Sequence, residues 1–447
     1  MKPWIPAGLA LAMSAPLAAR ADTSSDIAAL RQEMAATRAS SEQRLQILEQ
    51  RLQAAETATQ AAAGAAAAAV AAAPTPAGAA GGSNAFNPAV SLILSGTYAR
   101  TSRDPANYAI SGFALPAGSE AGPGSRGFSL AETELGLSAN IDPWLRGQTS
   151  ISFRPDNTVS VEEAFVQTTG LGKGLSLKAG RFFSGVGYLN EQHSHTWDFV
   201  DNPLAYQAFL GTQFGDDGVQ LRWLAPTDLF IEAGAEVGRG RAAPGSDTGR
   251  NGAGAGALFA HAGGDIGDSS SWRAGLSMLS ARATDQSLAT TGLAGSSLSG
   301  AFSGRSRVWI GDFVWKWAPG GNATRTNFKL QGEYLRSTRD GSLVDAGSAT
   351  APYNATQSGW YLQGIYQFMP RWRAGVRTER LDPGATNALT ATAYQPRKDS
   401  LMLDYNPSEF SRVRLQFSRD RSRLGLPDNQ LFLQYQMSLG AHGAHGY

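Results

Sequence analysis

The chain of 447 residues contains no cysteine, which excludes disulfides, thiol nucleophiles and thiolate metal sites. Charge of one sign is also lacking, since 38 Lys and Arg face 37 Asp and Glu. This balance gives no reason to expect a nucleic-acid partner. Beyond the N-terminus there is no run of ~18 apolar residues, so no transmembrane helix is expected.

The first 21 residues have the pattern of a secretory signal peptide. Lys2 precedes the apolar run "WIPAGLALAMSAPLAA", and Ala19-Arg20-Ala21 forms an A-x-A cleavage pattern. We therefore expect an exported chain, and the absence of cysteine suits the bacterial envelope.

Residues 22–60 are predicted to form a periplasmic coiled coil. The apolar positions keep a/d spacing in two blocks separated by a stutter, namely Ile27, Leu30 and Met34, then Leu45, Leu48 and Leu52. Residues 61–84 are rich in Ala, Pro and Gly, which is typical of a linker.

From residue 85 to 447 the pattern has period two. In "RVRLQFS", for example, Val413, Leu415 and Phe417 alternate with arginines and a glutamine. The same alternation recurs in about 16 segments, with charged residues on the polar face of nearly every one. The sequence predicts a 16-stranded antiparallel transmembrane β-barrel, with lipid outside and water inside.

The connections between these segments alternate in length. Short links are expected at 142–143, 170–174, 225–228, 267–270, 318–324, 369–371 and 406–410. Long loops are expected at 100–126, 184–216, 239–254, 283–305, 337–357 and 381–397. Short turns on one rim and long loops on the other are typical of outer-membrane barrels. Tryptophans beside the short links indicate an interfacial girdle: Trp144, Trp223, Trp272, Trp317 and Trp372.

The third long loop, 184–216, contains "NEQHSHTWDFVDNP" and supplies the candidates for a constriction of the lumen: Glu191, His193, His195, Asp198 and Asp201. Three interpretations remain open. The side chains brace the loop against the wall, they contact solutes, or His193, His195 and Asp198 bind zinc. No other cofactor is expected.

Side chains on the polar face of the strands are the candidates for lining the pore. The basic ones are Lys178, Arg222, Arg273, Lys329, Arg373, Arg377, Arg412 and Arg414. The acidic ones are Glu134, Glu163, Glu232, Glu236, Glu333 and Asp404. Charges of both signs predict a field across the lumen that influences which ions pass.

Residues 177–211 and 216–223 resemble the phosphate-selective porin family, Porin O and P. The resemblance rests on Gly180-Arg181-Phe182, on the segment 199–204, and on Gly218-Val219. It implies an outer-membrane homotrimer through which small hydrophilic solutes, anions such as phosphate among them, diffuse past an inward loop. The barrel departs from that family in having only five lysines: Lys173, Lys178, Lys316, Lys329 and Lys398.

Other functions are weighed against this one. Similar sequences are also labelled TonB-dependent or zinc-regulated receptors, but about 363 residues cannot hold a plug together with 22 strands. A zinc-linked uptake protein and a non-conducting structural barrel remain alternatives. No enzyme is expected, because Ser184, His193 and Asp198 occur without a nucleophile motif.

Overall fold

The computed structural model describes residues 88–440, apart from 117–118, 248, 250, 292–296, 346–348 and 391. Before residue 88 it describes five helical positions: Gln32, Met34, Ala35, Glu42 and Gln46. The chain divides into two units, Met1–Ser83 and Asn84–Tyr447. The signal peptide, the linker and most of the predicted coiled coil lie outside the described residues, so they stay predictions.

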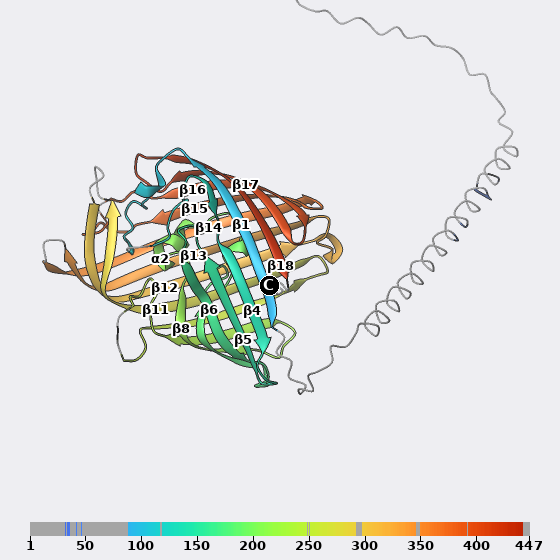
Figure 1. The fold of residues 1–447 in the computed structure, drawn as a ribbon, viewed down its shortest axis with the longest axis horizontal. Coiled ribbons are helices and arrows are strands. Elements are labelled where there is room, and N and C mark those ends of the chain that lie inside the picture. The colour runs from blue at the N-terminus through green and yellow to red at the C-terminus, as the bar shows by residue number, and fades with distance from the viewer. Residues whose placement is uncertain are drawn as a thin grey trace, which may run out of the picture. The chain divides into compact units, whose positions relative to one another are not determined.

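The described part of the second unit contains 18 strands in one antiparallel sheet, which closes into a barrel because β18 pairs with β1 (Figure 1). The first nine are β1 (Ala89–Thr101), β2 (Leu115–Pro116), β3 (Gly127–Leu130), β4 (Thr133–Asn140), β5 (Leu145–Phe153), β6 (Val159–Thr168), β7 (Leu175–Phe183), β8 (Gly215–Leu224) and β9 (Phe230–Gly238). The others are β10 (Ala255–Ile266), β11 (Ser270–Thr291), β12 (Ser297–Trp317), β13 (Asn327–Asp345), β14 (Thr350–Met369), β15 (Trp372–Asp382), β16 (Arg397–Ser408), β17 (Ser411–Arg421) and β18 (Asp428–Gly440).

The wall of the barrel consists of 16 strands, which confirms the predicted number. Strand β2 has only two residues, and its pairing is with β11. Strands β3 and β4 both pair with β1 and form two halves of one wall strand. Removing β2 and counting β3 with β4 as one strand reduces 18 to 16.

Four strands are longer than the sequence pattern indicated. Strands β11, β12, β13 and β14 have 22, 21, 19 and 20 residues, and they form two extended hairpins. The prediction of loops over 283–305 and 337–357 was therefore wrong for most of those residues. The extended ends keep one buried face, but that face is apolar, with Leu288, Phe302 and Leu343 in a second core cluster. Because apolar side chains point inward there, the alternation that marks a membrane strand is absent.

Burial along the strands is the reverse of that in a soluble protein. On β17, Val413, Leu415 and Phe417 are 41%, 45% and 45% exposed. Between them, Arg414 and Gln416 are fully buried inside the barrel. Apolar side chains turned outward and polar ones turned inward are stable only where lipid surrounds the barrel. Among the described residues, no helix is both long enough and apolar enough to cross a membrane.

The connection between β7 and β8, residues 184–214, enters the barrel and is called the inner loop below. It carries the short helices η2 (Ser194–Thr196) and α2 (Leu204–Leu210), and all seven residues of α2 are buried (Figure 1). Helix α2 belongs to an apolar core that includes Ile110 and Phe113 of the β1–β2 loop and inward residues such as Val308. The other two described short helices are η1 (Pro105–Asn107) and η4 (Pro319–Gly321). Apolar packing therefore fixes one side of the inner loop within the barrel.

Candidate functional site: the inner loop and its cavity

Inward glutamates hold the backbone of the inner loop. Glu333 on β13 accepts hydrogen bonds from the amides of Tyr188 and Leu189 at 3.2 and 3.0 Å, and from the Tyr206 hydroxyl at 2.8 Å. The chain approaches this carboxylate so closely that a Cβ at Gly187, where φ is +69°, would lie 2.4 Å from Glu333 Oε2. A buried carboxylate with several donors is a strong anchor, since each bond is charge-assisted.

Asp198 and Asp201, together called the aspartate arm, face the basic side chains of β13–β16. Asp198 pairs with Lys329 and lies 3.2 Å from Arg373 Nη1. Asp201 pairs with Lys398 and lies 2.8 Å from Arg377 Nη2. Each aspartate therefore has two basic partners on the wall.

Both aspartates are ionised over the ordinary pH range. Burial alone would raise the pKa of the Asp198 carboxyl, but the charges of Lys329 and Arg373 outweigh it and hold the pKa well below its usual value. For Asp201, burial is outweighed by Lys398 and Arg377 in the same way, and its pKa is also lowered. The aspartate arm is thus a set of charge-matched anchors.

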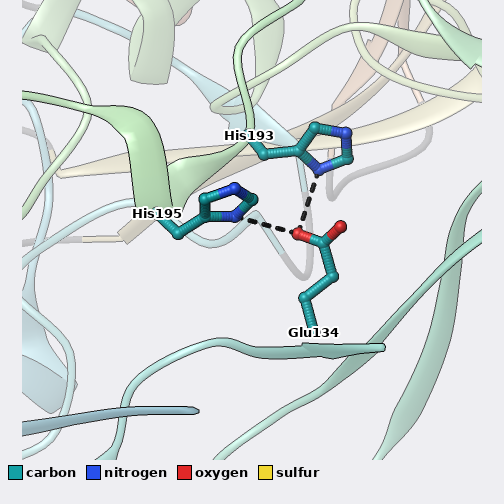
Figure 2. A group of neighbouring side chains, drawn as sticks. All are labelled: Glu134, His193 and His195. Carbon is teal, nitrogen blue, oxygen red and sulfur yellow. Dashed lines mark ion pairs between the residues drawn. The ribbon is translucent and has the colours of Figure 1, made fainter. Parts of the chain in front are cut away.

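His193 and His195, together called the histidine arm, face acidic side chains on another part of the wall, on and beside β4 and β6. The Nδ1 atoms of both point to one oxygen of Glu134, at 3.2 Å from His193 and 3.0 Å from His195 (Figure 2). Glu162 Oε2 lies 3.4 Å from His193 Nδ1, and Glu163 Oε2 lies 3.1 Å from His193 Nε2. Glu132 accepts a hydrogen bond from the Ser194 hydroxyl at 2.8 Å. Two imidazoles therefore meet four carboxyl groups.

Irregular pairing in the wall gathers these glutamates. The register of β5 with β6 pairs Ser150 with Glu163 and Ile151 with Val161, so Glu162 is an extra residue in a β-bulge. Adjacent residues of a regular strand point to opposite faces, but here Glu162 and Glu163 both reach His193. Glu132, at the break between β3 and β4, and Glu134, two residues later, also share the inner face.

A cavity of about 1050 Å³ lies beside the inner loop, within the barrel. Twelve of the predicted site residues line it: Lys178, Arg222, Arg273, Lys329, Arg373, Arg412, Glu163, Glu191, Glu232, His193, His195 and Asp198. The other seven are packed between loop and wall or between strands: Asp201, Arg377, Arg414, Glu134, Glu236, Glu333 and Asp404. The side chains predicted to point inward thus form two groups, one that lines the cavity and one that is packed around the loop or between strands.

The metal prediction needs one correction. Asp198 does not lie beside the two histidines, because it is paired with Lys329 and Arg373, and Glu134 is in the position expected for the third ligand. Sequence reasoning also missed Glu132, Glu162, Glu379 and Lys398. Lys398 could have been predicted, because on β16 its side chain points to the same face as that of Asp404. Glu162 was not, because only the bulge turns it inward.

The three residues considered for catalysis are not assembled. The Ser184 hydroxyl donates to Glu236 Oε2 at 2.5 Å, and His193 Nε2 contacts Glu163. Asp198 is engaged with basic residues of the wall. A serine nucleophile requires a histidine within hydrogen-bond reach, and here its partner is a carboxylate.

These features define the class of the protein. A closed sheet leaves no edge in the lipid, its apolar face is outward, and its polar interior surrounds a folded loop. Trp144 and Trp223, beside short turns, are 66% and 41% exposed, as in an interfacial girdle. The chain is an outer-membrane β-barrel of the bacterial type.

The chain belongs to the same family as an uncharacterized protein of Aquifex aeolicus. The two are 31% identical over 392 residues, which cover 81% of this chain and 80% of the relative. No model of a known protein family matches the sequence.

Several solved structures of outer-membrane proteins are similar to this chain at low sequence identity. A loop-deletion mutant of OmpT from Vibrio cholerae has 9% identity and a TM-score of 0.49, with 80% of this chain and all of that chain covered. The outer membrane channel DcaP of Acinetobacter baumannii has 13% identity and a TM-score of 0.48, over 79% and 97%. An anion-selective porin from Comamonas acidovorans has 10% identity and a TM-score of 0.49, over 79% and 99%.

Proposed function

We propose that the protein is an outer-membrane porin that lets small hydrophilic solutes diffuse through a lumen narrowed by the inner loop. One observation supports this above all: a closed barrel with a lipid-compatible outside contains a charged cavity of about 1050 Å³ beside that loop. Charged walls in a narrow channel select solutes through their local field. The proposal extends to a homotrimer in the outer membrane, with the N-terminal helix in the periplasm.

Anions are the preferred solutes in this proposal, with phosphate as one example. The less exposed carboxylates of the cavity are already paired: Asp198 with Lys329 and Arg373, and Glu191 and Glu232 with Arg222. Asp228, Asp265 and Glu409 also line the cavity, but they are exposed. Three bases that line the cavity make no ion pair with a carboxylate within the described part of the chain, namely Lys178, Arg273 and Arg412. Their uncompensated charge favours anions.

A non-conducting structural barrel is the second candidate, and the apolar core around α2 favours it. That core brings loop residues such as Leu204 and Phe209 against inward wall residues such as Ile310 and Leu335, so it fills part of the interior. The cavity lies on the other side of the inner loop and is lined largely by polar groups. The two candidates differ in whether water and ions pass.

Planar-bilayer recording of the purified full-length protein tests the proposal. Discrete conductance steps and a reversal potential in asymmetric KCl that indicates anion preference are expected. Replacing both Lys178→Gln and Arg273→Gln should reduce that preference at least twofold, whereas Lys173→Gln, an exposed turn lysine, serves as the matched control. No conductance would favour the structural barrel, and cation preference in the unaltered protein would contradict the anion assignment.

A further inference from the structure

We propose that His193, His195 and Glu134 bind a divalent transition-metal ion, for which zinc is the suitable probe, and that this ion fastens the first part of the inner loop to the barrel wall. The proposal goes beyond solute diffusion and does not depend on it. The site joins a loop segment to β4, which lies about 60 residues earlier in the chain.

Carboxyl groups outnumber basic side chains at the histidine arm. Four carboxyl groups, from Glu132, Glu134, Glu162 and Glu163, surround two imidazoles. Among the described residues, these carboxylates form ion pairs only with His193 and His195, and no lysine or arginine pairs with them directly. A buried site rich in carboxyl groups favours a bound cation.

The contact geometry at Glu134 suits metal ligands. Its Oε2 atom is buried, and the Nδ1 atoms of His193 and His195 lie 3.2 and 3.0 Å away (Figure 2). Bonds of about 2.0–2.1 Å to a tetrahedral zinc ion place neighbouring ligand atoms about 3.3–3.4 Å apart. The three candidate ligand atoms all lie within 4.8 Å of one another, so small shifts bring them to that spacing.

The Nε2 atom of His193 lies beside a carboxylate, as the free nitrogen of a metal-bound histidine commonly does. A proton on Nε2, donated to Glu163 Oε2 at 3.1 Å, leaves the lone pair of Nδ1 available to a metal ion. That lone pair faces oxygens of Glu134 and Glu162 at 3.2 and 3.4 Å. A metal ion between these three atoms would replace a proton as the group that links them. A carboxylate behind a metal-bound histidine is the common outer-shell arrangement.

Two imidazoles with carboxylates select the first-row transition metals from Mn²⁺ to Zn²⁺ over Ca²⁺ and Mg²⁺, which prefer oxygen ligands alone. The bulge at Glu162 supplies a fourth ligand candidate, and Glu163 orients His193. A second histidine cluster in the barrel lacks these features: His261 faces Glu232 at 3.1 Å and Asp312 at 3.8 Å, with no second imidazole. It is the natural internal control.

The test measures zinc bound to the full-length protein folded in detergent, without a polyhistidine tag. All samples carry His442→Ala and His445→Ala, so that the chain end cannot bind the metal. Equilibrium dialysis against micromolar ZnCl2, followed by elemental analysis, should give one zinc per chain. The pair His193→Ala and His195→Ala should weaken binding at least 100-fold, and His261→Ala should leave it unchanged.

Zinc X-ray absorption of the protein with both histidines intact provides a readout that does not depend on the folding of a variant. Two imidazole nitrogens and carboxylate oxygen in the first shell would support the site. No bound zinc, a shell without two imidazoles, or equal loss of zinc in His261→Ala would overturn it. In the absence of zinc binding, a proton shared between His193 and the glutamates is the remaining explanation for the cluster.

Discussion

Both arms attach the inner loop to the barrel wall, but they do so with side chains of opposite charge. The aspartate arm carries two acids into a basic part of the wall, and each acid meets two bases there. The histidine arm, three residues earlier, carries two weak bases into an acidic part of the wall. In the first set each acid has two basic partners from this chain, whereas in the second the carboxyl groups outnumber the imidazoles.

This difference shows when buried charges on the barrel wall are sufficient to hold the inner loop in position. Buried ion pairs hold a segment only when each charge has partners and hydrogen bonds, and the aspartate arm meets that condition. A site with excess charge either takes up protons or binds a counterion. We therefore expect the aspartate arm to respond to substitution of its own residues and the histidine arm to respond to metal.

The largest effect is expected from Asp201→Ala. The substitution removes the carboxylate that Arg377 and Lys398 share and leaves them only Glu379 and Asp420 as acidic partners. Loss of a buried partner costs about 3 kcal/mol. Amide hydrogen exchange in the inner loop should then become roughly 100-fold faster, since 1.4 kcal/mol corresponds to tenfold. Mass spectrometry of peptides spanning residues 184–214, in detergent, measures this change.

Asp399→Ala is the matched control for that substitution. Asp399 also pairs with an arginine, Arg380, at 3.3 Å, but its side chain is 45% exposed. Exposed pairs contribute only about 0–1 kcal/mol. Equal acceleration in both variants would show that the aspartate arm does not hold the loop.

An intermediate effect is expected from Glu163→Gln, which sharpens the comparison at the histidine arm. An amide nitrogen in place of the carboxylate donates to His193 Nε2, so the proton of the imidazole moves to Nδ1 and the lone pair toward Glu134 is lost. Zinc affinity should fall about 10–100-fold, as for other outer-shell partners. Glu232→Gln, which changes the carboxylate beside His261, should leave zinc affinity unaltered.

The smallest effect is expected from mild acid on the aspartate arm. The pKa values of Asp198 and Asp201 are lowered by their basic partners despite burial. Their stabilisation is therefore present above the unfolded value, about 3.9, and is lost only as the pH falls through the lower folded values. Hydrogen-exchange protection of residues 198–201, corrected for intrinsic rates, should not change between pH 7 and 5. A tenfold loss by pH 5 would contradict the lowered pKa values.

The barrel was predictable because lipid imposes a simple rule on the strands. Alternation such as that of Val413, Arg414, Leu415 and Gln416 is needed wherever a strand crosses the membrane, and the number of wall strands followed from it. The rule ends at the lipid boundary. In the extended ends of β11–β14 the alternation is reversed, with Phe302 and Leu343 buried inward and Arg305 and Arg307 exposed. The membrane pattern is therefore missing there, and the sequence indicated loops.

Of the candidate site, only the residues of the inner loop could be predicted from the sequence. The spacing of His193 and His195 was visible in the chain, but nothing in the sequence indicates that Glu134 on β4 lies between their Nδ1 atoms. Asp198 was nearer in sequence and was predicted as the third ligand, but it pairs with Lys329 and Arg373 on another part of the wall. Pairing register and a single bulge decide these contacts, and neither has a local sequence signature.

The proposal that lipid surrounds the barrel while water fills the cavity inside is tested most directly by spin labels along β18. The chain has no cysteine, so each single-cysteine variant carries one label. Labels at Tyr435, Met437 and Leu439, all exposed outward, should collide with oxygen dissolved in lipid, and labels at Gln436 and Ser438, which line the cavity, with a water-soluble nickel complex. Alternation of the two accessibilities at every residue is the expected result. Equal access of the nickel complex to both faces would contradict it.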